Sequence, residues 1–224
     1  MCTKHSYCLH FHHPPFNIIV LSVILNHTDS YSYLELQLEE VSTMSDTIMT
    51  IDLLDYDSSW PIVSRVSVRG IIIVGNQILL NYDPRNMYYS FPGGGQKTGE
   101  THIETLEREL NEETGYKINR SSAVLYGKTL LKKTDEPASE SIYIGESFYY
   151  KVDVDPNRGE PHLTRNELYR HMQCDFIDIH SAVRQNAKSL ERLRKMRTVI
   201  GIRQVLFLER ETAVLRKLRL ETAI

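Results

Sequence analysis

The sequence has little that would place the protein in a membrane, outside the cell or on a nucleic acid. Its longest apolar run, residues 16–25, is about half as long as a membrane-spanning helix needs to be. Three cysteines, two of them near the N-terminus, offer no disulfide framework and favour a reducing compartment. A net charge of −3 predicts neither a nucleic-acid coat nor a membrane-surface protein. We therefore expect a cytoplasmic protein without membrane or nucleic-acid partners.

Repeats and low-complexity tracts are also absent from the sequence. The chain has 224 residues, 41% of them hydrophobic and 25% charged, which suits one globular domain of ordinary size with extensions. The question is then where the domain begins and which residues carry its chemistry.

Residues 1–45 differ from the rest of the chain. The apolar run within them resembles the hydrophobic part of a signal peptide, but no small-residue cleavage site follows it. Cys8, His10, His12 and His13 have the composition of a loose metal site, yet no second ligand pair stands nearby. We expect residues 1–45 to be a disordered or dispensable N-terminal extension, and a signal peptide is the less favoured interpretation.

Short apolar and alternating segments after residue 60 predict a β-sheet. Strict alternation marks a half-buried strand, while a solid apolar run suits a central strand. Gly75-Asn76 is a two-residue turn signal between two of these segments and predicts a hairpin. The predicted strands are residues 63–69, 70–74, 77–82, 122–131, 141–144, 147–154 and 174–179.

A glycine-rich loop and an acidic helix follow the predicted hairpin. Thr101 with Glu104 three residues later is a capping box, which predicts that a helix begins there. Gly115 suits the position just after the end of that helix. Closely spaced glycines before the helix allow the backbone to turn sharply and to approach a ligand; they are Gly93, Gly94, Gly95 and Gly99.

The predicted helix carries three carboxylates beside its buried face. At helical spacing Glu109, Glu112 and Glu113 are surface neighbours. Because like charges at this spacing repel one another, the cluster favours a bound cation. Oxygen ligands select hard ions, Mg²⁺ first and Mn²⁺ next. The apolar face of the helix is formed by Ile103, Leu106 and Leu110.

The spacing of these residues resembles the Nudix box, the signature of the Nudix hydrolase family. Tyr116 departs from the pattern, because an aliphatic residue is usual there; this affects packing at the helix exit and leaves the charged positions unchanged. The preceding segment, residues 90–93, is similar to the family's entry into the loop. The matching positions are Gly94, Glu100, Arg108, Glu109, Leu110, Glu112, Glu113 and Gly115.

The resemblance implies an α/β fold, a Nudix-type α/β/α sandwich around a mixed β-sheet, over residues 60–195. Residues 180–224 have a helical pattern, so residues 196–224 are expected to form a C-terminal helical extension. Between residues 184 and 219 eleven Lys or Arg stand against three Glu. This basic surface has two interpretations. It favours phosphate-rich ligands, or it is the solvent-facing side of a helix that packs on the domain or forms a homodimer.

The resemblance also implies a reaction: hydrolysis of the diphosphate linkage in a nucleoside diphosphate joined to another moiety. The substrate is then a small-molecule nucleotide, and the cofactor is Mg²⁺, with Mn²⁺ as an alternative. Glu109, Glu112 and Glu113 would hold the metal, with the Gly94 carbonyl as a further ligand. Arg108 would lie beside the carboxylates and fix their conformations.

The general base is left open by the resemblance. It is a box glutamate, for which Glu112 is favoured, or an acid of the loop 159–167, where Glu160 and Glu167 are the candidates. The catalytic residues are expected to be Glu112, Arg108 and Glu109. The remaining motif positions are expected to be structural, with Glu100 bracing the loop; they are Gly93, Gly95, Glu100, Leu110 and Gly115.

The sequence does not select the second moiety of the substrate. ADP-ribose pyrophosphatases often carry a proline some sixteen residues beyond the box, and here the nearest is Pro137. Tyr126 and Tyr143 bracket, without matching, a tyrosine typical of dinucleoside-polyphosphate hydrolases. The coenzyme A and NADH signatures are not found. The alternative to an enzyme is a catalytically silent Nudix-fold module that senses nucleotides or binds a partner.

Overall fold

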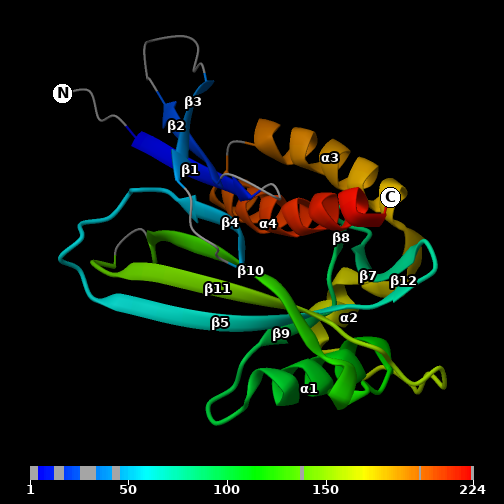
Figure 1. Cartoon of the computed structure of the whole chain (residues 1–224). Helices are drawn as coiled ribbons and strands as arrows, with labels where there is room; N and C mark the ends of the chain where they lie inside the picture. Colours follow the sequence, from blue (N-terminus) through cyan, green and yellow to red (C-terminus); the bar gives the residue numbers. More distant parts are fainter. Residues whose placement is uncertain are drawn as a thin grey trace. The chain divides into compact units, whose positions relative to one another are not determined.

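The computed structural model describes residues 5–12, 18–25, 34–41, 46–136, 139–196 and 198–222 (Figure 1). The chain divides into two compact units. Unit 1 comprises residues 1–66 and 127–147, and unit 2 comprises residues 67–126 and 148–224. Three long strands contribute residues to both units: β5 (Ile62–Ile71), β10 (Val124–Thr134) and β11 (Ile142–Lys151).

Unit 1 is a mixed β-sheet. Its strands lie in the order β3-β2-β1-β4-β10-β11-β5. Strand β4 pairs in parallel with β10, whereas β1 pairs antiparallel with β2 and β4. Parallel and antiparallel pairs in one sheet confirm the predicted mixed sheet. The strands not yet given bounds are β1 (His5–His12), β2 (Ile18–Leu25), β3 (Leu34–Val41) and β4 (Thr47–Asp52).

The N-terminal boundary of the domain lies within unit 1. Strand β4 precedes residue 60, where the sequence pattern places the start of the domain, and it buries Ile48, Met49 and Ile51. Residues 1–4, 13–17, 26–33 and 42–45 of the predicted extension lie outside the described residues. That residues 1–45 are dispensable therefore stays a prediction.

Unit 2 contains the glycine loop, the helices and a second sheet, in which strands follow the order β12-β7-β6 with β8 paired to β7. The predicted hairpin is confirmed: β6 and β7 are joined by the two-residue turn Gly75-Asn76, with Gly75 at φ 59°. Strand β9 pairs antiparallel with β5. The elements are β6 (Ile73–Val74), β7 (Gln77–Asp83), β8 (Tyr88–Ser90), β9 (Gly93–Gly95), α1 (His102–Thr114), a 3₁₀ turn (Arg120–Ser122), α2 (Arg165–Arg170), β12 (Gln173–Asp178), α3 (Ile179–Lys195) and α4 (Val199–Thr222).

Helix α1 begins and ends as its sequence predicts. Thr101 accepts the Glu104 N–H, and the Glu104 carboxylate accepts the Thr101 N–H at 2.7 Å, so both halves of the capping box are present. Gly115 ends the helix in the left-handed conformation. Leu106 and Leu110 are fully buried in one hydrophobic cluster, which continues through Val68, Ile72, Leu79 and Val152.

Helices α3 and α4 pack on a different hydrophobic cluster. Leu190 and Leu193 of α3 meet Leu208 of α4 and Tyr88 of β8. Within unit 2, α1 and the α3–α4 pair thus cover separate clusters around the strands (Figure 1). The predicted α/β fold is confirmed. None of the helices in the described residues is both long and apolar enough to cross a membrane.

Three parts of the predicted secondary structure need correction. The expected strand 70–74 is divided between the end of β5, at Ile71, and the two-residue strand β6. The expected strands 141–144 and 147–154 are one continuous strand, β11. The expected helical stretch 180–224 is two helices, because the backbone is extended at Met196 and the Thr198 hydroxyl accepts the Gly201 N–H at 3.0 Å. The second helix therefore has a start signal of its own.

Helix α4 is part of the core of unit 2, although it lies beyond the predicted domain end at residue 195. Glu211 of α4 is only 2% exposed. Its carboxylate accepts the Phe91 N–H at 2.7 Å and the Tyr149 hydroxyl at 2.9 Å. This buried carboxylate attaches α4 to the chain segment that enters the glycine loop.

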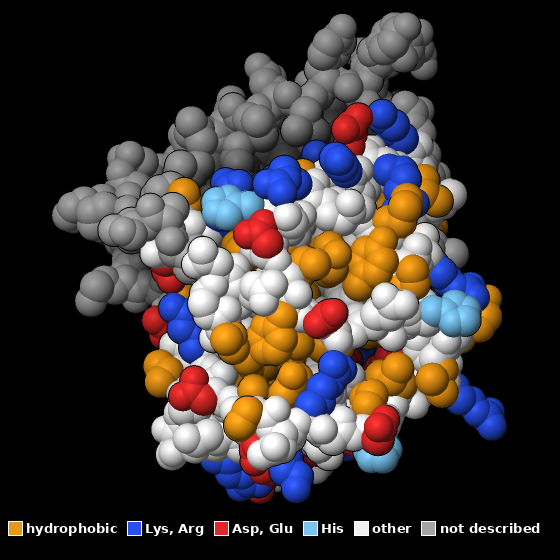
Figure 2. Space-filling model, turned by 90° about the vertical axis from the view of Figure 1, so that its right-hand side faces the viewer, with side chains coloured by type: hydrophobic (Ala, Val, Ile, Leu, Met, Phe, Trp, Pro, Cys, Tyr) orange, Lys and Arg blue, Asp and Glu red, His pale blue; other side chains and the backbone are white. Residues whose placement is uncertain are grey.

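Some large apolar side chains stay at the surface. Leu168 and Tyr169 of α2 are 57% and 65% exposed. Val199 and Ile202 of α4 are exposed to a similar degree. Figure 2 shows one face of the molecule, on which hydrophobic side chains form several patches among charged ones. Scattered patches of this kind are normal for a protein surface.

We expect Glu211→Ala to lower the free energy of unfolding by about 2 kcal/mol, because the Phe91 N–H and the Tyr149 hydroxyl would be left buried without an acceptor. Urea denaturation followed by circular dichroism measures the change. The control is Glu191→Ala on α3, whose exposed carboxylate pairs with the exposed Lys195, and which should leave stability unchanged. Equal stability of the two variants would contradict the structural role of Glu211.

Candidate active site

Residues 91–93 enter the glycine loop, and each of their polar backbone groups has a hydrogen-bond partner. The Phe91 N–H donates to Glu211, and the Gly93 N–H donates to Glu113 at 2.8 Å. The Arg69 guanidinium donates to the carbonyls of Phe91 and Gly93. The Pro92 carbonyl accepts a backbone N–H, that of Gly70, at 2.8 Å. All backbone donors and acceptors of residues 91–93 are thus satisfied, and the loop starts from a fixed position.

A Cβ at Gly93 would meet backbone, whereas a Cβ at Gly94 would meet the end of a side chain. Gly93 has φ 132°, and a Cβ there would lie 2.1 Å from the Val68 carbonyl oxygen. A Cβ on Gly94 would lie 2.5 Å from the carboxylate of Glu109. The missing side chain of Gly94 therefore makes the space that the Glu109 carboxylate occupies. The structure brings these two predicted site residues together.

Arg108 links the acidic residues of the box. Its Nε and Nη2 donate to Glu100 at 2.6 and 2.8 Å, and its Nη1 donates to Glu109 at 2.6 Å. The same Nη1 lies 3.5 Å from Glu112, and Nη2 donates to the Gly95 carbonyl at 3.1 Å. These contacts hold Arg108 between the loop and the helix.

Glu100 bonds to both the glycine loop and helix α1. Besides Arg108, its carboxylate accepts the Lys97 N–H at 3.0 Å and the Thr105 hydroxyl at 2.9 Å. The bonds to Arg108 and Lys97 lower the pKa of Glu100 to about 2. Glu100 therefore stays ionised at any ordinary pH. Its bonds to Arg108 keep the guanidinium beside Glu109.

Glu113 has partners that the sequence does not indicate. It is buried, and its carboxylate accepts the Asn81 amide at 2.7 Å as well as the Gly93 N–H. Burial raises the pKa of Glu113 to about 7, while the charge of Arg69 opposes that rise. The sequence does not indicate that Asn81 and Arg69 lie beside Glu113. The available signal was a polar residue inside an otherwise apolar strand, as at Asn81 after Ile78-Leu79-Leu80.

Glu160 and Glu167, the two candidate acids beyond the box, lie in different structural environments. The segment that contains Glu160 bonds to the end of α1, through His162 N–H to the Glu112 carbonyl at 2.7 Å, and Glu160 itself is exposed. Glu167 belongs to α2 instead of the predicted loop, and its carboxylate accepts the Thr164 N–H at 2.7 Å. The capping box that starts α2, Thr164 with Glu167, was readable in the sequence.

The donor set at Gly94 fits a hard divalent cation. Glu109 and Glu112 provide carboxylate oxygens, and the Glu109 carboxylate lies against the backbone of Gly94. Oxygen donors of this kind suit Mg²⁺. Within the described part of the chain, no three acidic, His or Cys side chains converge on one point; Glu113 is engaged with Gly93 and Asn81. The Glu109 carboxylate thus lies against Gly94, and Glu112 is linked to Glu109 through Arg108 Nη1, which lies 2.6 Å from one carboxylate and 3.5 Å from the other.

Several solved structures resemble parts of this chain. A MutT structure from a study of Aliivibrio salmonicida and Vibrio cholerae is 19% identical, covering 52% of this chain and 79% of that chain, with a TM-score of 0.35. The MutT protein of Bacillus halodurans is 19% identical, covering 54% and 72% of the two chains, with a TM-score of 0.34. A MutT Nudix hydrolase from Burkholderia pseudomallei is 19% identical, covering 53% and 85%, with a TM-score of 0.33.

The family model described as the NUDIX domain matches residues 63–196. That range is more than half of the chain, and it contains the glycine loop, α1 and all the box residues described above. The chain therefore belongs to the Nudix family and is a Nudix hydrolase, an enzyme that acts on phosphoric anhydride bonds.

Proposed function

We propose that the protein hydrolyses the diphosphate linkage of a nucleoside diphosphate joined to another moiety, with Mg²⁺ as its cofactor. Nudix hydrolases are generally pyrophosphohydrolases, and the proposal specifies the substrate class and the metal. The observation that carries it is the packing of the Glu109 carboxylate on Gly94, with Arg108 bonded to Glu100 and Glu109.

Glu109 and Glu112 are the side chains that we propose hold the metal, with Glu113 and the Gly94 carbonyl as further ligands. When bound, Mg²⁺ supplies positive charge that offsets the charge of the diphosphate. Arg108 cannot bind a cation. Its role is to keep the Glu109 carboxylate against Gly94 and the Glu112 carboxylate on the same side of the helix.

Glu112 is the group that we propose takes the proton of the attacking water. Its side chain is 38% exposed, against 14% for Glu109, so water reaches it more readily. The water oxygen forms a bond to phosphorus, the bond from that phosphorus to the bridging oxygen breaks, and the proton passes to Glu112. Glu160 and Glu167 are the alternatives. Glu167 is the less favoured of these two, because its carboxylate already accepts the Thr164 N–H in the capping box of α2.

The proposed substrate is a small-molecule nucleotide, and the proposed location is the cytoplasm. Three cysteines in 224 residues support a reducing compartment.

The first test is metal-dependent turnover. We expect the full chain to release phosphate-containing products from at least one member of a panel of nucleoside diphosphate derivatives in Mg²⁺ or Mn²⁺, and none in EDTA, while its circular dichroism is the same in all three buffers. Tight binding of a panel member without turnover would instead favour the catalytically silent module.

The second test compares two glutamates of the same helix. Glu109→Gln should lower kcat by at least ~10²-fold, because one charge leaves the proposed metal site. Glu107→Gln is the matched control: Glu107 lies two residues away on α1, pairs with Arg120 outside the box, and should leave kcat unchanged. Normal turnover by Glu109→Gln would remove α1 from the proposed metal site.

The third test uses two glycines. Gly94→Ala places a methyl group where the Glu109 carboxylate lies, so we expect kcat to fall by about 10²-fold through misplacement of that carboxylate. Gly75→Ala meets no atom within 4 Å but strains a turn at φ 59°, so it should cost about 1 kcal/mol of stability and leave kcat intact. If the two variants lose activity equally, loop strain accounts for the loss instead of carboxylate placement.

A further inference from the structure

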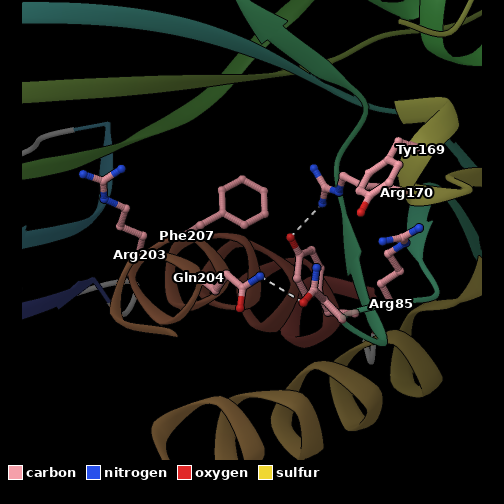
Figure 3. Close-up of a pocket in the computed structure, with 8 residues that line it drawn as sticks. Arg85, Tyr169, Arg170, Arg203, Gln204 and Phe207 are labelled. Atoms are coloured by element: carbon pink, nitrogen blue, oxygen red, sulfur yellow. Dashed lines mark hydrogen bonds between the residues drawn. The ribbon is translucent and has the colours of Figure 1, made fainter. Parts of the chain in front are cut away.

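Unit 2 has a pocket whose lining includes none of the box residues (Figure 3). It lies between the β7–β8 loop, strand β8, helix α2 and helix α4, and its volume is about 530 Å³. Pockets of this size hold small organic ligands. The lining residues are Arg85, Asn86, Tyr88, Tyr169, Arg170, Arg203, Gln204 and Phe207.

The charge of the lining favours an anion. Three of the eight lining residues are arginines, and none is acidic. Arg170 is held in place by Asp83, with Nε to Oδ2 at 2.9 Å, and by the Tyr88 hydroxyl at 3.0 Å. Asp83 is almost fully buried, so it offsets the charge of Arg170 from beneath the pocket. Guanidinium groups in fixed positions suit phosphate oxygens, which they can bind in pairs.

Aromatic surfaces stand beside these arginines. The Arg85 guanidinium lies 3.9 Å from the centroid of the Tyr169 ring, and Tyr169 is 65% exposed. In Figure 3, Arg85 and Tyr169 lie at one end of the pocket and Arg203 lies at the other, with Phe207 between the two ends. A planar base stacks on exposed rings and on guanidinium planes. Stacking surfaces next to cations match a base joined to a phosphate.

The pocket wall is held in place before any ligand binds. Asn86 accepts the Gln204 amide at 2.9 Å and donates its own amide to Asp83 at 2.8 Å. Arg192 of α3 donates to the Asn86 carbonyl. The β7–β8 loop is thus tied to two helices and to β7. A wall that is already ordered loses little conformational entropy on binding.

The pocket differs from the proposed metal site in its residues and in its origin. Arg203, Gln204 and Phe207 belong to α4, beyond residues 63–196 that match the family. Its link to the glycine loop is indirect: Phe207 lies 5.8 Å from the Arg69 guanidinium, which donates to the Gly93 carbonyl. The pocket therefore combines five residues of the matched range with three residues of α4.

We propose that this pocket binds a nucleoside phosphate, with the phosphate at the arginines and the base against the aromatic rings. The nucleotide comes from one of two sources: it is part of the substrate molecule, or it is a separate nucleotide. Binding at the pocket does not depend on the hydrolysis proposed above, because no proposed metal ligand lines it.

Fluorescence anisotropy of a methylanthraniloyl derivative of ADP, titrated with the full chain in EDTA, tests the proposal. We expect saturable binding, and Kd should rise about tenfold in Arg85→Gln, which removes a charge-assisted contact, and about tenfold in Tyr169→Leu, which removes a stacking surface. Both side chains are exposed, so both variants should fold. Arg165→Gln, which changes an exposed arginine of α2 outside the pocket, should keep the wild-type Kd.

The proposal would be overturned by no binding, by an unchanged Kd in both pocket variants, or by inorganic phosphate competing as well as ADP. Competition by a short single-stranded RNA at lower concentrations than ADP would also overturn it, in favour of a polynucleotide site.

Hydrolysis assays in Mg²⁺ then distinguish the two sources. A raised KM with unchanged kcat in Arg85→Gln would assign the pocket to the nucleotide of the substrate. An unchanged KM, with an effect of added ADP on the rate that disappears in Arg85→Gln, would assign it to a separate nucleotide. Either result supports the pocket, and a chain that binds the ADP derivative but hydrolyses nothing would refute the proposed function alone.

Discussion

The backbone of residues 91–93 is the constraint on which the site depends. Carboxylates from two helices, Glu211 of α4 and Glu113 of α1, accept its two N–H groups, while Arg69 donates to two of its carbonyls. A buried peptide group without a partner costs about 1–3 kcal/mol, so the position of this segment is strongly determined. Strand β9, which contains Gly94, continues from this segment. The position of Gly94 decides where the Glu109 carboxylate can lie.

Charge on the site is divided between carboxylates with different neighbours. Arg108 is bonded to Glu100 and Glu109, and Glu100 keeps its charge because its pKa is lowered to about 2. Glu113 faces the interior, where burial raises its pKa to about 7. On one helix, therefore, Glu109 and Glu112 lie beside the Arg108 guanidinium, while Glu113 faces the interior and accepts the Gly93 N–H. The same residue type has two roles because burial differs along the helix surface.

Helix α4 joins the two sites that we propose. Glu211 on its inner side holds the entry to the glycine loop, and Phe207, one turn earlier, lines the arginine-rich pocket. A ligand in the pocket would contact the helix that positions the loop.

Local chemistry in the sequence determined helix α1, its caps, the hairpin at Gly75 and the grouping of Arg108 with Glu109 and Glu112, because these depend only on residues a few positions apart. The partners of Glu113, the buried role of Glu211 and the arginine pocket depended on the tertiary structure. They join residues far apart in the chain, such as Phe91 with Glu211, and no spacing rule predicts such contacts. Burial, which only the fold sets, decided which glutamate faces solvent and which holds a backbone.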